Sequence, residues 1–188
     1  MCYIGAGKGK TTAAMGVAVR AAGYGMDVYI LQFVKADPAT PTADISAGEW
    51  PLSNEINFFN RIATPPPLGK IYTEQVGKGF VGILGDQKDK DIHIAAAKMG
   101  LQKAESLIQS GQYQLIILDE LISALELNLI TEQDIVGLIH KKPPTLHVIL
   151  TGHNKYDTII EACDLVTEMK MIKHPYYSGV LAQEGIDY

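Results

Sequence analysis

The residues best suited to chemistry lie near the start of the chain, in the segment Gly5-Ala6-Gly7-Lys8-Gly9-Lys10-Thr11-Thr12. Glycines in such a turn let backbone N–H groups converge on an anion, and a helix that begins at the turn adds the positive end of its dipole. Lys10 supplies a mobile charge for phosphate oxygens, and the Thr11 hydroxyl suits a magnesium ligand. The segment therefore predicts a phosphate-binding loop.

The spacing of this loop differs from the usual pattern by one residue. That pattern has four residues between its first glycine and the glycine of Gly-Lys-Thr, whereas three separate Gly5 from Gly9. Ile4 stands where the first glycine is expected, so the prediction needs support from elsewhere in the chain.

A second candidate group is the pair Asp119 and Glu120, which follows an apolar run and therefore ends a buried strand. Parallel sheets place ligands at the carboxyl ends of their strands. An acidic strand end about a hundred residues after a phosphate loop is the expected partner for holding magnesium or its water shell. A solvated acidic strand end is the alternative interpretation.

The elements that must position these groups alternate along the chain. Strands are expected at residues 1–4, 27–34, 113–120, 146–152 and 165–169, and helices at 10–24, 92–109, 131–140 and 155–162. Thr131 and Asp134 are expected to cap the helix at 131–140. This alternation predicts one three-layer α/β domain over residues 1–188, with a mainly parallel sheet, helices on both faces and the phosphate-binding loop at its carboxyl edge.

Residues from about 36 to 88 interrupt the alternation. They include Pro65-Pro66-Pro67 and Gly77-Lys78-Gly79, with only short strand-like pieces such as 56–59. The aromatic residues of this stretch argue against full disorder, and its length favours a substrate-binding loop over an irregular excursion.

Composition narrows the class of protein. The chain has 188 residues, 47% hydrophobic and 20% charged, as in ordinary globular domains, and its net charge of −5 argues against a general nucleic-acid surface. Its two cysteines are far apart in sequence, which argues against a disulfide framework or a thiolate metal cluster. No apolar run reaches membrane-spanning length and the phosphate loop starts almost at once, so we expect no membrane association, no signal peptide and a cytoplasmic location.

Several separated segments together resemble one family, the phosphate-loop type of ATP:corrinoid (cob(I)alamin) adenosyltransferase. The resemblance covers nearly the whole chain except the central loop, and the segment near the C-terminus is its most specific part. The matching segments are GAGKGKTTAA (5–14), LQFVK (31–35), LDEL (118–121), LTG (150–152), DLVTEM (164–169), KHP (173–175), Gly179 and AQEGIDY (182–188).

The resemblance implies the fold of P-loop NTPases of the RecA-like kind, and a reaction in which cob(I)alamin cobalt attacks the 5′-carbon of ATP and triphosphate leaves. It implies that ATP lies reversed in the loop, that Lys8 and Lys10 neutralise the triphosphate, and that no general base is needed, which leaves His147, His153 and His174 without that role. Mg²⁺ or Mn²⁺ would be held by Thr11 and Glu120 with Asp119 close by. A flavoprotein reductase as electron donor and a homodimer are also implied.

Residues 36–88 would bind the corrinoid, and Phe80 would help to displace its lower axial ligand. The segment Gly77-Lys78-Gly79-Phe80-Val81-Gly82 resembles the family's Gly-x-Gly-Phe-x-Trp stretch, but Gly82 stands at the tryptophan position. His153 stands where the family usually has arginine.

Two other functions remain open from the sequence. A phosphate-loop ATPase or kinase would attack the terminal phosphate, with Glu120 as its base, but Ile4 argues against it. A non-catalytic corrinoid or nucleotide sensor is the other, and Gly82 is the residue that favours it.

Overall fold

The computed structural model describes residues 1–34, 54–79, 81, 88–183 and 185–186. Its centre is a six-stranded sheet in the order β3-β2-β4-β5-β1-β6, and every neighbouring pair of strands is parallel. The strands are β1 (Cys2–Ile4), β2 (Val28–Gln32), β3 (Ile71–Gln75), β4 (Leu115–Asp119), β5 (His147–Thr151) and β6 (Val166–Glu168).

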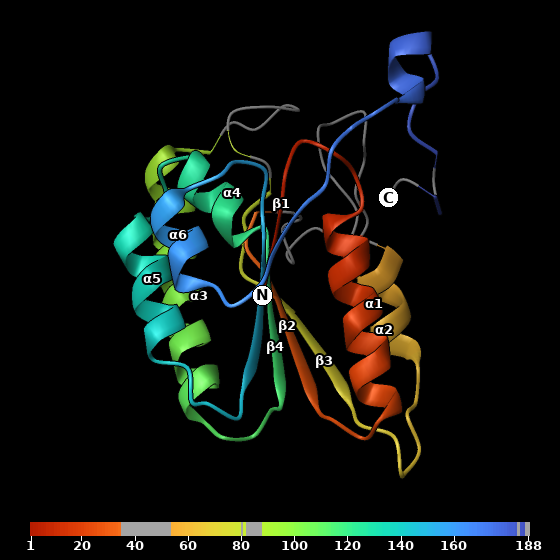
Figure 1. The fold of residues 1–188 in the computed structure, drawn as a ribbon, viewed down its shortest axis with the longest axis vertical. Helices are drawn as coiled ribbons and strands as arrows, with labels where there is room; N and C mark the ends of the chain where they lie inside the picture. Colours follow the sequence, from red (N-terminus) through yellow and green to blue (C-terminus); the bar gives the residue numbers. More distant parts are fainter. Residues whose placement is uncertain (35–53, 80, 82–87, 184, 187–188) are drawn as a thin grey trace.

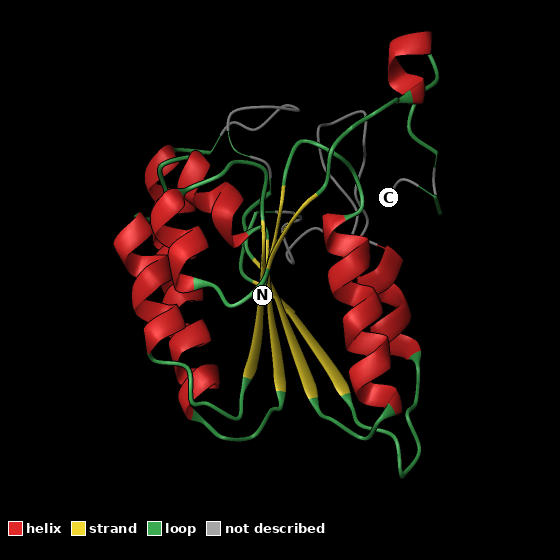
Figure 2. Ribbon diagram, in the orientation of Figure 1, coloured by secondary structure: helices red, strands yellow, loops and turns green. Residues whose placement is uncertain are grey.

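Helices cover both faces of this sheet (Figures 1 and 2). One face carries α1 and α2, and the other carries α3 to α6. The helices are α1 (Lys10–Gly23), α2 (Asn54–Arg61), α3 (Lys90–Gln109), α4 (Leu121–Glu126), α5 (Glu132–His140) and α6 (Asp157–Ala162), and a 3-10 turn, η2, spans Pro175–Ser178. This three-layer architecture confirms the predicted α/β fold.

The alternation of side chains along the strands divides the core into two layers. On β2, Val28 and Ile30 pack with α1 and α2, whereas Tyr29 and Leu31 pack with the helices of the opposite face. Both sets are buried, because a parallel sheet between two helical layers has no solvated face.

Three elements differ from the sequence prediction. Residues 56–59, predicted as strand-like, lie inside helix α2, where Ile56 and Phe59 are spaced three apart and form its buried face. Strand β3 also lies in the stretch predicted to have little regular structure. Helix α4, for which no element was predicted, follows β4 directly.

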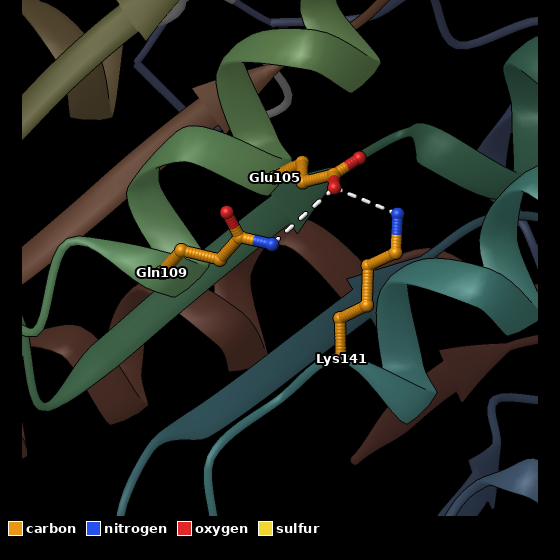
Figure 3. A network of polar contacts seen from close by, with 3 residues as sticks. All are labelled: Glu105, Gln109 and Lys141. Atoms are coloured by element: carbon orange, nitrogen blue, oxygen red, sulfur yellow. Dashed lines mark hydrogen bonds and ion pairs between the residues drawn. The ribbon is translucent and has the colours of Figure 1, made fainter.

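Surface contacts join neighbouring helices on the α3–α5 face. Lys141 at the end of α5 donates to Glu105 of α3 at 2.7 Å, and Gln109 donates to the same carboxylate at 3.3 Å (Figure 3). These side chains are exposed, and their contacts are separate from those of the glycine loop. A substitution here, such as Lys141→Ala, is therefore a suitable control for substitutions in the loop. None of the described helices has the length and apolar character needed to cross a membrane.

Candidate nucleotide and metal site

The glycine-rich loop connects β1 to α1 at the carboxyl edge of the sheet. Gly5 and Gly9 have φ angles of 110° and 101°, a region that side chains with a Cβ rarely adopt. Along the loop Gly5 and Gly7 are buried whereas Ala6 and Lys8 are exposed. The loop therefore presents one edge to the protein and the other to solvent.

Main-chain contacts hold the buried edge of the loop. The Gly5 N–H donates to the carbonyl of His153, and the Gly7 N–H donates to the carbonyl of Met169, both at 2.8 Å. A Cβ at Gly5 or Gly7 would lie 2.4 or 2.7 Å from the Met169 carbonyl oxygen, so this close approach requires glycine. The segment after β6 is thus a structural support of the loop.

A salt bridge lies beside this support. Lys155 donates to Glu168, the last residue of β6, at 2.8 Å. This hydrogen bond lowers the pKa of the Glu168 carboxyl below its ordinary value. This ion pair lies next to Met169, the residue that supports Gly7.

Lys10, the first residue of α1, points its ammonium into the loop. Its Nζ donates to the carbonyls of Gly5 and Gly7, both at 2.8 Å, and the side chain is only 6% exposed. The positive charge therefore lies at the centre of the loop, beside the positive end of the α1 dipole.

Asp119, at the end of β4, is fully buried, and its carboxylate accepts hydrogen bonds from side chains of α1, β2 and β5. Its Oδ1 accepts from the hydroxyls of Thr11 at 3.0 Å and Thr151 at 2.8 Å, and its Oδ2 accepts from the Gln32 amide at 3.0 Å. The loop follows β1 and Asp119 ends β4, and β5 lies between these two strands in the sheet. The first turn of α1 reaches across the end of β5, so that Thr11 contacts Asp119. The structure therefore brings Thr11 and Asp119 together.

Glu120 occupies the N-cap position of α4. Its backbone is left-handed, with φ of 59°, which is uncommon for residues other than glycine. Its N–H donates to the Thr151 hydroxyl at 2.7 Å, and its carboxylate accepts from Ser123. The Ser123 hydroxyl also lies 3.3 Å from Nδ1 of His153, so the histidine contacts this network through serine.

The oxygen atoms of Thr11, Asp119 and Glu120 are of the kind that binds a small, hard metal cation. A hydroxyl has one donor hydrogen and two lone pairs, so Thr11 can donate to Asp119 and still offer oxygen to a metal ion. Within the described residues, no three His, Cys, Asp or Glu side chains are grouped so as to hold a metal by themselves.

Sequence analysis named some residues of this contact network as site candidates and did not name others. The loop, Lys10, Thr11, Asp119 and Glu120 were predicted, and Lys8 is exposed at the outer edge of the loop. Gln32, Thr151 and Ser123 were not predicted as site residues, although Gln32 is a polar residue in an otherwise apolar strand and signals a specific role. Phe80 and Gly82, predicted for the corrinoid, lie outside the described residues.

The fold and the site define an α/β protein with a glycine-rich loop at the carboxyl edge of a parallel sheet. Comparison with known proteins identifies its family. The family described as ATP:corrinoid adenosyltransferase BtuR/CobO/CobP matches residues 1–188. The chain belongs to this family, which confirms the resemblance seen in the sequence.

Individual relatives agree with this assignment. A corrinoid adenosyltransferase of Sinorhizobium sp is 35% identical over 185 residues, which cover 98% of this chain and 77% of the relative. The corrinoid adenosyltransferase of Escherichia coli K12 is 31% identical over 186 residues, 99% of this chain and 83% of the relative. One from Pseudomonas aeruginosa is 30% identical over the whole chain and 82% of the relative. The relatives are transferases by name.

Proposed function

We propose that this protein transfers the 5′-deoxyadenosyl group of ATP to the cobalt of a reduced corrinoid, cob(I)alamin or a relative, and releases triphosphate. Family membership supports this reaction over a phosphate-loop ATPase or kinase and over a non-catalytic sensor. The observation that carries the proposal is the position of the Lys10 ammonium within the glycine loop, one residue from the Thr11–Asp119 contact.

The loop would bind the triphosphate through residues 5–12. In this reaction reduced cobalt is already the nucleophile, so the protein needs no base; negative charge builds up on the leaving triphosphate. Lys10 has three N–H donors on a flexible stem and can exchange a loop carbonyl for a phosphate oxygen. Lys8, at the exposed edge of the loop, would add a second positive charge.

Thr11, Glu120 and Asp119 would hold Mg²⁺ or Mn²⁺. When bound, the ion neutralises part of the triphosphate charge and acts as a Lewis acid toward it. Thr11 and Glu120 would offer oxygen directly. Asp119, which accepts hydrogen bonds from Thr11, Gln32 and Thr151, would orient Thr11 and bound water.

The corrinoid would bind over residues 36–88, with Phe80 displacing its lower axial ligand. Gly82 at the family's tryptophan position favours a corrinoid whose lower ligand is absent or weakly held, or the use of another aromatic residue of this stretch. As for other members of the family, we expect a homodimer that acts in the cytoplasm and receives electrons from a flavoprotein reductase.

An anaerobic assay tests the proposed reaction. ATP, Mg²⁺ and chemically reduced cob(I)alamin are mixed with the protein, the visible spectrum is followed and the phosphate product is identified. Adenosylcobalamin together with intact triphosphate is expected. ADP and phosphate would support the kinase or ATPase instead, and nucleotide binding without turnover would support the sensor. Lys10→Ala is expected to abolish turnover, whereas the exposed lysine variant Lys141→Ala is a matched control.

A further inference from the structure

Three polar residues lie side by side across three strands at the carboxyl edge of the sheet. In the strand register Gln75 of β3 pairs with Gln32 of β2, and Gln32 pairs with Asp119 of β4. Gln75 Nε2 donates to Gln32 Oε1 at 3.0 Å, and Gln32 Nε2 donates to Asp119 Oδ2 at 3.0 Å. We call these two amides the glutamine relay.

The burial of Gln32 argues for a specific role. The residue is completely buried and follows four buried apolar residues in β2. A buried amide is costly unless its polar atoms are hydrogen-bonded, and here both ends of the amide are bonded. An apolar residue at this position would pack in the same layer but could not contact a carboxylate productively.

The direction of the relay is fixed by its acidic end. In the structure the NH₂ group of Gln32 faces Asp119 and donates to its Oδ2. The Gln32 carbonyl then faces Gln75, whose NH₂ group satisfies it. Each amide therefore prevents its neighbour from flipping.

The relay determines how Asp119 presents its second oxygen. Rotation about the terminal torsion of an aspartate is soft, so hydrogen bonds rather than rotamer preference must fix the two oxygens. With Oδ2 held by Gln32, Oδ1 is turned to the hydroxyls of Thr11 and Thr151. A Thr11 hydroxyl that donates to Oδ1 directs its lone pairs away from Asp119 and keeps them available to a second partner.

From this geometry we infer that Gln32, supported by Gln75, is a positioning residue for metal-assisted nucleotide binding: it fixes the Asp119 carboxylate that orients Thr11. The inference rests on the proposed function for its ligand, ATP with Mg²⁺, but it concerns binding and does not require transfer to cobalt. Partners that orient metal ligands typically change metal affinity by about 10- to 100-fold when they are removed.

The test is calorimetric measurement of ATP affinity with and without Mg²⁺, on wild type, Gln32→Leu and Gln75→Leu. In wild type Mg²⁺ is expected to tighten ATP binding. In Gln32→Leu this gain is expected to fall by about 10- to 100-fold, while affinity for ATP alone changes little, because Gln32 contacts Asp119 and Gln75, outside the glycine loop. Gln75→Leu keeps the Asp119 donor and is expected to lose less of the gain.

Gln114→Leu is the matched control, since Gln114 is exposed and bonds the Asp27 N–H just before β2, at the opposite edge of the sheet. If Gln32→Leu does not fold, as judged by its melting transition, the gain in ATP affinity from Mg²⁺ measured on Gln75→Leu tests the inference by itself. An unchanged gain from Mg²⁺ in the folded relay variants, a parallel loss with and without Mg²⁺, or a wild type indifferent to Mg²⁺ would overturn the inference. A wild type that binds ATP as expected but makes no adenosylcobalamin would overturn the proposed function and leave the relay standing.

Discussion

The packing of the loop against the chain after β6 makes Gly7→Ala the most informative single substitution. A Cβ at Gly7 would lie 2.7 Å from the Met169 carbonyl oxygen and 2.9 Å from the carbonyl carbon of Lys170. These are backbone atoms, so no side chain can swing aside. The loop or the supporting segment must move, and the hydrogen bond from Gly7 to Met169 is lost or strained.

The magnitude follows from the cost of overpacking a fitted site, about 1–3 kcal/mol. For a chain of this size each kcal/mol lowers the melting temperature by about 2–4 °C, so we expect a decrease of about 2–12 °C. If the free loop instead relaxes and relieves the clash, the melting temperature falls less, and ATP bears that cost when it restores the original loop. Each 1.4 kcal/mol is a tenfold change, so ATP affinity is expected to fall by about 5- to 150-fold.

Gly16→Ala is the control, because it makes the same chemical change in an open position. Gly16 lies in α1, is exposed, and a Cβ there would have no heavy atom within 4 Å. Alanine in an exposed helix interior is more favourable than glycine by about 0.5–1 kcal/mol, so this variant should melt slightly higher and bind ATP normally. Differential scanning calorimetry and ATP titration measure both effects. Equal behaviour of the two variants would refute the close approach of the loop to Met169.

Three further results are expected. Lys10→Ala should remove most of the affinity for inorganic triphosphate in a direct binding assay, and an unchanged affinity would contradict its assignment. Phe80→Ala should slow the reaction from cob(II)alamin plus reductant more than that from pre-reduced cob(I)alamin; equal slowing would exclude a role in displacing the lower ligand. Iodoacetamide at neutral pH should label Cys163 before Cys2 in peptide mass spectrometry, because a hydrogen bond from the fully buried Cys2 lowers the pKa of the half-buried Cys163 thiol. Labelling of Cys2 before Cys163 would contradict this order of thiol reactivity.

Local patterns predicted the features that local interactions determine. The glycine loop before a helix starting at Lys10, and the cap of α5, depend on residues within a few positions of each other. The structure has α1 starting at Lys10, and Thr131 and Asp134 form the reciprocal capping box. Asp119 was placed at a strand end because the apolar run before it stops there.

The remaining features depend on interactions between distant segments. Helix α2 lies in a proline-rich stretch that obscured the spacing of Ile56 and Phe59, and α4 is too short and too buried to show a helical period. Gln32 meets Asp119 only because β2 lies beside β4 in the sheet, and that strand order cannot be read from either strand. The buried polar character of Gln32 was visible in the sequence, but its partner was not.

The support of the loop also bears on how it can bind an anion. Because the N–H groups of Gly5 and Gly7 donate to protein carbonyls, their hydrogens point to the buried side of the loop. We infer that triphosphate binding depends more on the later loop residues, on the Lys10 ammonium and on the amino end of α1, where N–H groups and dipole point outward together. This gives a physical reason for the segment 164–169 to accompany the loop in the family resemblance. It contains β6, which pairs with β1, and Met169, whose carbonyl accepts a hydrogen bond from the Gly7 N–H, so it supports the conformation of the loop from which Lys10 and Thr11 would contact the proposed ligand.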